Sequence, residues 1–289
     1  MLHSNPISSD ENSHVLSWTA RDIEQRIGVR GGRFTGTNGI FTFLLAIFLT
    51  IAFYALLLPF RDRYFAQMFT ERGVVQYVTV FFSFWALVMI LIKTQKIRLQ
   101  RQALAVALVP SDPDFVLSVA TAEDVVRRLH AACDDPRHFL LFNRIDVGLA
   151  NLKNMGRISD LDEVLGSQAD KDEDVMESSY SLIRGLIWAI PVLGFIGTVQ
   201  GLSQAVGNFG SVLSSSTEVS SLKPALQGVT AGLAVAFETT FIALVAALSI
   251  QMLLTLVKRS EEQLLDDCKE YCQRKIIGRL RIMPFERTG

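Results

Sequence analysis

The sequence predicts an all-α polytopic membrane protein with four transmembrane helices and a helical cytoplasmic domain, in which the last helix extends into the cytoplasm. Three observations support this fold class. The 289 residues are 49% hydrophobic yet still 20% charged, four long apolar runs divide the chain, and one long polar segment separates them into two pairs. Each run reaches the roughly 20 residues that a helix needs to cross a bilayer. The runs are 39–60, 73–92, 185–206 and 224–257.

These runs divide the chain into five segments. Residues 1–38 form a cytoplasmic N-terminal segment, and 39–92 hold two accessory transmembrane helices with a short outer loop. Residues 93–184 form a helical cytoplasmic domain, 185–257 contain the third and fourth transmembrane helices, and 258–289 form a cytoplasmic helical tail.

The distribution of Lys and Arg predicts that both termini lie in the cytoplasm, because cytoplasmic ends of spans carry an excess of these residues. The connection between the third and fourth spans contains a single basic residue, Lys223. Three arginines in the first outer loop, Arg61, Arg63 and Arg72, weaken the contrast. The predicted cytoplasmic cations are Arg21, Arg26, Arg30 and Arg33 before the first span, Lys93, Lys96, Arg98 and Arg101 after the second, and Lys258 and Arg259 after the fourth.

The segment 93–184 has a helical pattern with turn signals at 111–114 and 134–136. We expect Ser159 to be the N-cap of a further helix. The acidic run 170–174 is expected to be a solvated helix start or loop, with a docking surface as the alternative. The apolar positions that recur at helical spacing are Val116, Val119, Val125, Val126 and Leu129.

The fourth run is too long for the membrane alone. Its 34 residues would form a helix of about 50 Å, against a hydrocarbon core of about 30 Å. A stripe of mostly apolar residues continues beyond it, so we expect the helix to extend into the cytoplasm and bury this stripe against the middle segment or a neighbouring subunit. The stripe consists of Leu264, Leu265, Cys268, Tyr271, Cys272 and Ile276.

Small residues recur every three or four positions in the last two spans, which places them on one face of each helix. Such faces let helix backbones approach closely inside a membrane. Simple packing within one chain, with each Thr hydroxyl bonded to its own helix, is an equally good interpretation. The third span carries Pro191, Gly194, Thr198, Gly201 and Ala205, and the fourth carries Gly228, Gly232, Ala236, Thr240, Ala243 and Ala247.

Glu238 is the only charged residue within the four runs. An intramembrane carboxylate costs about 3 kcal/mol on insertion scales, so it should face protein or water, and an ion pathway is the first hypothesis for it. The alternative is a protonated Glu bonded to Gln200, Gln204 or a Thr of a neighbouring helix. Glu238 and Thr240 point about 200° apart around the helix axis, so both cannot face one pore squarely.

Other function classes find little support in the sequence. The basic residues do not interleave with aromatic residues, so no nucleic-acid partner is expected. The acidic pairs 134–135 and 172–173 lack companions at ligand spacing, and no nucleophile with an acid–base pair is recognisable, so an enzyme is not expected. We expect no cofactor and no bound metal. Contact with membrane lipid follows from the four spans.

The last two spans resemble the MotA/TolQ/ExbB proton channel family across residues 183–257. The likeness rests on Pro191, Gly194, Gly197, Thr198 and Gly201, followed by a second helix with Gly232, Ala234, Ala236, Thr240, Leu244, Ala246 and Ala247. It implies a homopentamer in the bacterial inner membrane that surrounds two single-span partners of the MotB/ExbD/TolR kind. Each partner carries a transmembrane Asp, and ion flow drives rotation about the partner dimer.

By this resemblance Thr198 and Thr240 line the path of a transported proton, or of sodium, while Pro191 and Gly194 form its cytoplasmic mouth. Gly197, Gly201, Gly232 and Ala236 would serve helix packing and gating. The two spans before the cytoplasmic segment are closer to MotA, whereas the motif text is closer to ExbB and TolQ. Where ExbB has a membrane Glu, this chain has Val235.

Two function hypotheses therefore stand. The first is an ion-channel subunit of a motor or energy transducer driven by the proton-motive force. The second is a non-conducting membrane scaffold held together by the small-residue faces, and such a scaffold has no use for Glu238.

Overall fold

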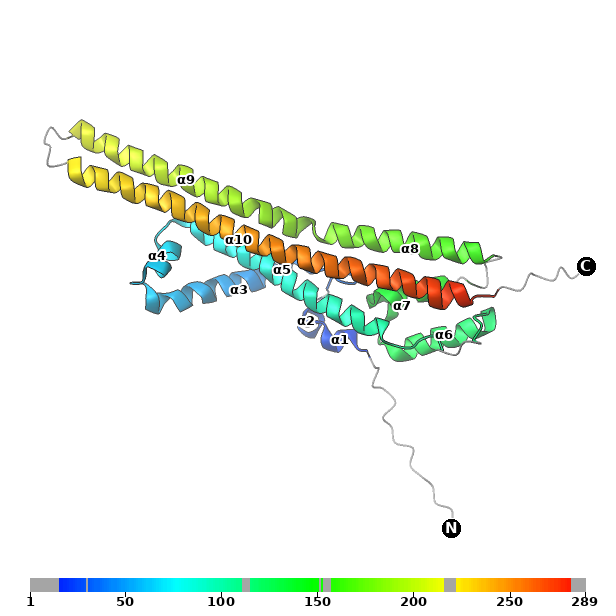
Figure 1. The fold of residues 1–289 in the computed structure, drawn as a ribbon. Coiled ribbons are helices and arrows are strands. Elements are labelled where there is room, and N and C mark those ends of the chain that lie inside the picture. The colour runs from blue at the N-terminus through cyan, green and yellow to red at the C-terminus, as the bar shows by residue number, and fades with distance from the viewer. Residues whose placement is uncertain are drawn as a thin grey trace, which may run out of the picture. The chain divides into compact units, whose positions relative to one another are not determined.

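The computed structural model describes residues 16–29, 31–110, 115–150, 152, 157–215 and 222–281. Arg30 and the predicted turn at 111–114 lie outside these residues. The described chain is helical and contains no strand, and four of its helices are long and apolar enough to cross a membrane (Figure 1). The predicted all-α fold with four membrane-spanning helices is confirmed.

The chain forms two compact units. One unit, here called the polar unit, comprises the described residues of 1–36, 95–176 and 261–289. The other, the membrane unit, comprises 37–94 and 177–260. The long helices α5 (Val74–Leu104) and α10 (Leu222–Tyr271) each contribute residues to both units.

The membrane unit contains α3 (Gly39–Leu57), the short helices η1 (Leu58–Phe60) and α4 (Tyr64–Thr70), most of α5, α9 (Ser181–Ser215) and most of α10. Asn38 caps α3 by accepting hydrogen bonds from the backbone N–H groups of Ile40 and Phe41. Pro59 lies in η1, directly after α3 ends. The segment 58–73 then joins α3 to α5 and is called the first connection below.

The polar unit contains α1 (Trp18–Arg21), α2 (Ile23–Arg26), α6 (Val119–Ala132), η2 (Pro136–His138), α7 (Leu140–Ala150), most of α8 (Ile158–Ser179), and the turns η5 (Cys272–Ile276) and η6 (Ile277–Arg279). Asp134 joins α1 to the region after α6, because it accepts hydrogen bonds from the backbone N–H groups of Trp18 and Thr19. Burial opposes ionisation of Asp134, but these hydrogen bonds outweigh it and lower its pKa below the usual value.

The helix α10 is continuous over 50 residues, from Leu222 to Tyr271. The prediction that the fourth helix continues beyond the membrane run is thus confirmed in its helical extent. In the polar unit Leu264, Cys268, Cys272 and Ile276 of the predicted stripe are buried. The chain that follows pairs with the middle segment, since Leu117 and Arg281 are joined by a backbone hydrogen bond.

The apolar pattern from Val116 to Leu129, which predicted a helix, is only partly helical. Val125 and Leu129 are buried in α6 as predicted, whereas the side chains of Val116 and Val119 are exposed. Residues 115–118 are not helical, because the backbone of Leu117 pairs with that of Leu280 and Ser118 begins the helix with a capping box. Helical spacing therefore does not apply to Val116.

Two predictions about α8 were wrong. The helix begins at Ile158, so Ser159 lies in its first turn and is not the N-cap. Asp160, in the same turn, accepts a hydrogen bond at 3.1 Å from the backbone N–H of Arg157, the residue before the helix. The acidic run 170–174 is neither a helix start nor a loop, because it lies inside α8.

One acid of this run is buried. Asp172 is only 2% exposed and accepts hydrogen bonds from Nε and Nη2 of the buried Arg144 at 3.2 and 2.9 Å. The amide of Gln168 donates a further hydrogen bond at 3.0 Å. The acidic run thus contributes an ion pair to the interior of the polar unit, which its composition alone did not indicate.

Removal of either member of the Arg144–Asp172 pair should destabilise the polar unit strongly. Arg144→Met or Asp172→Asn leaves an uncompensated buried polar group, at a cost of about 3–5 kcal/mol. The double variant Arg144→Met/Asp172→Leu should recover most of this loss, because it removes both charges. Thermal or denaturant unfolding of the four proteins measures the effect, and equal stability of the single variants and the native chain would contradict it.

Candidate functional site

The helices α9 and α10 run side by side (Figure 1). Their facing surfaces are built from the small residues that the sequence singled out. Gly194, Gly197, Gly201 and Ala205 of α9 are buried there. They face a buried stripe of α10 that consists of Ala236, Thr239, Ala243 and Ala247, with the half-buried Gly232 at its end. The two facing sets of residues together are called the seam below.

The two backbones approach so closely that most of these glycines have no room for a methyl group. A Cβ atom on Gly194 would lie 2.7 Å from Cβ of Ala243, and one on Gly232 would lie 2.6 Å from Cβ of Ala205. A Cβ on Gly201 would lie 3.0 Å from the carbonyl oxygen of Gly232. Small residues are therefore a geometric requirement of this contact.

The threonine hydroxyls of the seam have different partners. Thr240 donates to the carbonyl oxygen of Gly194 across the two helices at 2.9 Å. Thr198 donates to the carbonyl oxygen of Phe195 in its own helix, at 2.6 Å, and its side chain is half-exposed. The interpretation that Thr hydroxyls bond back to their own helix therefore fits Thr198 and not Thr240.

Sequence reasoning missed Thr239, the most buried polar residue of the seam. It is 1% exposed, and its Oγ1 lies 2.7 Å from where a Cβ on Gly197 would stand. Its position three residues after Ala236 and four before Ala243 could have identified it. On α9 the corresponding exchange is from Thr198 to Gly197, while the predicted Gly194, Gly201 and Ala205 are buried in the contact.

Three predicted site residues lie away from the close contact. Pro191 is half-buried inside α9, where it removes one helix hydrogen bond without ending the helix. Gly228 is exposed, and a Cβ added there would meet nothing within 4 Å. Glu238 contacts the first connection. This agrees with the predicted angle of about 200° between Glu238 and Thr240, since Thr240 bonds to α9.

Glu238 is held by two residues of the first connection. Its Oε2 lies 2.7 Å from Nε of Arg72 in an ion pair, and its Oε1 accepts a hydrogen bond from the hydroxyl of Tyr64 at 2.5 Å. The side chains of Arg72 and Glu238 are only 18% and 13% exposed. The alternative in which Glu238 bonds to Gln200, Gln204 or a Thr was wrong, since both glutamines are exposed and Glu238 contacts Arg72 and Tyr64 instead.

A second ion pair lies further along α10, where Lys258 contacts Glu177 at 3.0 Å. The helix rises about 30 Å from Glu238 to Lys258, which is the thickness of the hydrocarbon core. Arg72, moreover, lies two residues before the start of α5. This spacing favours a position of Glu238 near one edge of the bilayer over a position deep in the hydrocarbon core.

The surface of α9 and α10 away from the seam is both apolar and polar. Gln200, Ser203, Gln204 and Thr230 are exposed although they lie within or beside long apolar runs. Polar side chains in membrane helices usually face protein or water and seldom lipid. Large apolar side chains are exposed as well, among them Phe195, Val199, Leu202, Phe237, Phe241, Leu244 and Leu248.

These features define a multi-pass membrane protein whose last two spans form a close pair through small residues. The sequence model of the MotA/TolQ/ExbB proton channel family matches residues 140–270. The matched segment contains the seam. No curated protein and no solved structure matches the chain.

Gly232→Ala should loosen the seam. The new methyl group would overlap Cβ of Ala205, and overpacking of this kind costs about 1–3 kcal/mol. Ala205→Gly in the same chain removes the nearest obstructing atom and should restore part of the stability, since the carbonyl oxygen of Gly201 still lies 3.1 Å from the new methyl group. Gly185→Ala is the control, because a Cβ there meets nothing within 4 Å. Thermal unfolding in detergent measures these differences, and an equal effect of Gly185→Ala would refute the packing argument.

Arg72→Gln and Glu238→Gln should each weaken the attachment of the first connection to α10. A charge-assisted contact of this kind contributes about 1.5–3 kcal/mol, which partial exposure reduces. In the double variant the losses should not add, because the second substitution removes a partner already lost. Tyr64→Phe removes only the hydrogen bond and should cost less. Additive losses in a double-mutant cycle would show that the pair is not coupled.

Proposed function

We propose that this chain is the ion-conducting subunit of an energy transducer driven by the proton-motive force. It would assemble as a homopentamer around two single-span partners of the MotB/ExbD/TolR kind in a bacterial inner membrane, with both termini in the cytoplasm. Inward flow of protons, or of sodium, would drive rotation about the partner dimer. The family match over the segment that contains the seam is the observation that carries this proposal.

The surface of α9 and α10 supports an assembly. A single chain leaves Gln200, Gln204 and Thr230 uncovered, and Gly207 and Gly210 have nothing near them. Exposed glycines in a helix cost stability unless another backbone comes close. Neighbouring subunits and a central partner helix would cover both kinds of residue.

Thr198 and Thr240 remain the proposed ion-pathway hydroxyls, but they differ in how accessible their hydroxyl groups are. Thr198 is half-exposed on α9, so its hydroxyl is accessible to a partner helix or to water. Thr240 is engaged with the Gly194 carbonyl across the seam, and it would contribute to the pathway only at the edge of the pair. A hydroxyl suits ion transfer because it both donates and accepts hydrogen bonds.

For Glu238 the pairing with Arg72 favours the structural role that the sequence left open. A carboxylate neutralised by a guanidinium is a poor carrier, because taking up a proton would break the ion pair. A conducting carboxylate would then have to come from the partner, as the family resemblance implies. Each charge that crosses 100 mV supplies about 2.3 kcal/mol, so several ions can drive one mechanical step.

The non-conducting scaffold remains the second candidate. Its support is the seam itself, because Gly194, Gly201 and Gly232 are used for packing within one chain. The expectation that a scaffold has no use for Glu238 does not hold once Glu238 is paired with Arg72, because a scaffold would have the same seam and the same ion pair. Ion flux is therefore the property that separates the two functions.

Ion uptake into liposomes tests the proposal, with this chain co-reconstituted with a candidate single-span partner whose span contains an Asp. The partner Asp→Asn variant should abolish flux. Thr240→Val should reduce flux, and Thr240→Ser should retain it, because only the hydroxyl is tested. Thr255→Val is the matched control on α10, since Thr255 is exposed and bonds to its own helix at Gln251.

If Glu238 is structural, Arg72→Gln and Glu238→Gln should change flux to the same extent. If Glu238 conducts, only Glu238→Gln should abolish it. An assembled complex that carries no ions, even after removal of the partner's region outside the membrane, would overturn the channel and favour the scaffold.

A further inference from the structure

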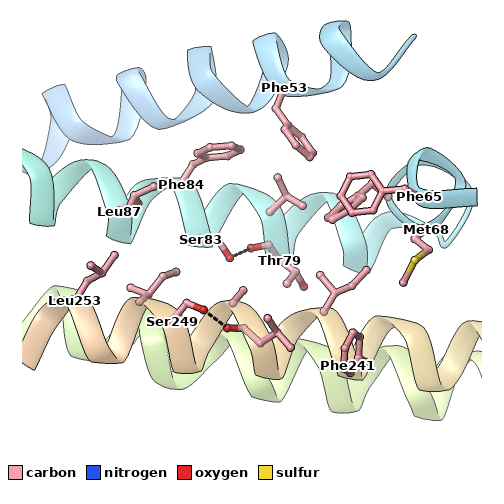
Figure 2. Close-up of a pocket in the computed structure, with 16 residues that line it drawn as sticks. Phe53, Phe65, Met68, Thr79, Ser83, Phe84, Leu87, Phe241, Ser249 and Leu253 are labelled. Carbon is pink, nitrogen blue, oxygen red and sulfur yellow. Dashed lines mark hydrogen bonds between the residues drawn. The ribbon is translucent and has the colours of Figure 1, made fainter. Parts of the chain in front are cut away.

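A cavity of about 620 Å³ lies in the membrane unit between the first two spans and α10. Figure 2 shows its lining, in which aromatic and aliphatic side chains from α3, α4 and α5 face those of α10. The first two spans contribute Phe53, Phe84 and Leu87 to the lining, and α4 contributes Phe65 and Met68. The helix α10 contributes Phe241, Ala246, Ser249 and Leu253.

The few hydroxyl groups in the lining are already engaged. Thr79 donates to the carbonyl oxygen of Val75 at 2.9 Å, Ser83 to that of Thr79 at 2.7 Å, and Ser249 to that of Val245 at 2.8 Å. Figure 2 shows the bonds of Ser83 and Ser249 running along their helices. A buried water needs two to four polar partners, which these walls do not supply. The cavity therefore suits an apolar occupant.

Three of the helices that form the cavity, α3, α5 and α10, are candidate membrane spans, so the medium around them is lipid hydrocarbon. Phe65, Phe241 and Leu253 are also among the exposed large apolar residues, so the lining continues onto the surface of the unit. An acyl chain can thus enter from the bilayer without losing contact with apolar groups. Leaving a space of this size empty would forfeit dispersion contacts on every side.

The first connection supplies cations beside the cavity. Arg61 and Arg63 are exposed, and Arg63 is two residues before Phe65 of the lining. Unlike Arg72, which is paired with Glu238, neither has an ion pair with any of the described residues. Asp62 lies between them. Guanidinium groups bind phosphate through paired hydrogen bonds, and the end of a span is where lipid phosphates lie.

We propose that this cavity binds one acyl chain of a membrane phospholipid, with the lipid phosphate on Arg61 and Arg63. The lipid would fill the space between the first two spans and the helix that carries the seam. This proposal stands whether or not the chain conducts ions, because it rests on the lining and on the two arginines.

Photolabelling with a phospholipid that carries a diazirine on its acyl chain tests the proposal, with the full chain in nanodiscs of that lipid mixed with phosphatidylglycerol. Mass spectrometry should locate the label on lining peptides that contain Phe84 or Ser249. Ala246→Trp fills the cavity and should reduce this labelling several-fold. Leu248→Trp is the matched control, because Leu248 lies on the same helix, is exposed and does not line the cavity.

The headgroup contact is tested separately with Arg61→Gln/Arg63→Gln, which leaves the cavity walls intact. This variant should reduce labelling by the phospholipid probe, and a diacylglycerol probe without phosphate should be insensitive to it. Each variant is first compared with the native chain by circular dichroism and elution volume. If Ala246→Trp fails that comparison, the arginine variant still decides.

Two results would overturn the proposal. One is labelling spread over the exposed faces, unchanged by Ala246→Trp and by the arginine variant. The other is crosslinking of a photoreactive residue placed at Ser249 to a second copy or to a partner helix and not to lipid, which would assign the cavity to an assembly contact.

Discussion

The architecture of the last two spans depends on a helix contact made almost without side chains. In a bilayer, lipid tails solvate Leu as well as protein does, so helices gain little from bringing large apolar residues together. Close packing of backbones is what remains, and the glycines of α9 provide it against Ala236, Thr239 and Ala243. The larger apolar residues are then left on the outer surfaces, where lipid or neighbouring helices can meet them.

Charged residues define the ends of this arrangement. The ion pair of Arg72 with Glu238 attaches the first connection to α10, and that of Lys258 with Glu177 joins α10 to the last turn of α8. Lys93 of α5 contacts the residues that follow Glu177 in the chain. Its ammonium group donates a hydrogen bond to Ser179 at 2.7 Å and lies over the ring of Tyr180. Arg72 thus has a counter-ion within the protein, which explains one of the arginines that weakened the predicted orientation.

Periodicity and length were sufficient for the four spans and for the extended last helix, because both follow from backbone geometry and hydrophobicity alone. The same signals placed most small residues of both helices on the correct faces, but they put Thr198 and Thr240 in the stripes where the structure buries Gly197 and Thr239. The partners of Glu238 and Asp172 could not be predicted. Both acids pair with residues distant in sequence, and such pairings depend on how helices pack, which composition and spacing do not encode.

The absence of long side chains in the seam has a mechanical consequence. Helices that meet through rotatable side chains can slide by exchanging rotamers, whereas Gly194 and Gly232 offer no such freedom. Thr240 further links the two helices through the Gly194 carbonyl. The spans α9 and α10 should therefore move as one rigid body. A conformational change would then be accommodated outside the pair, for instance at the turn around Tyr180, where α8 ends and α9 begins.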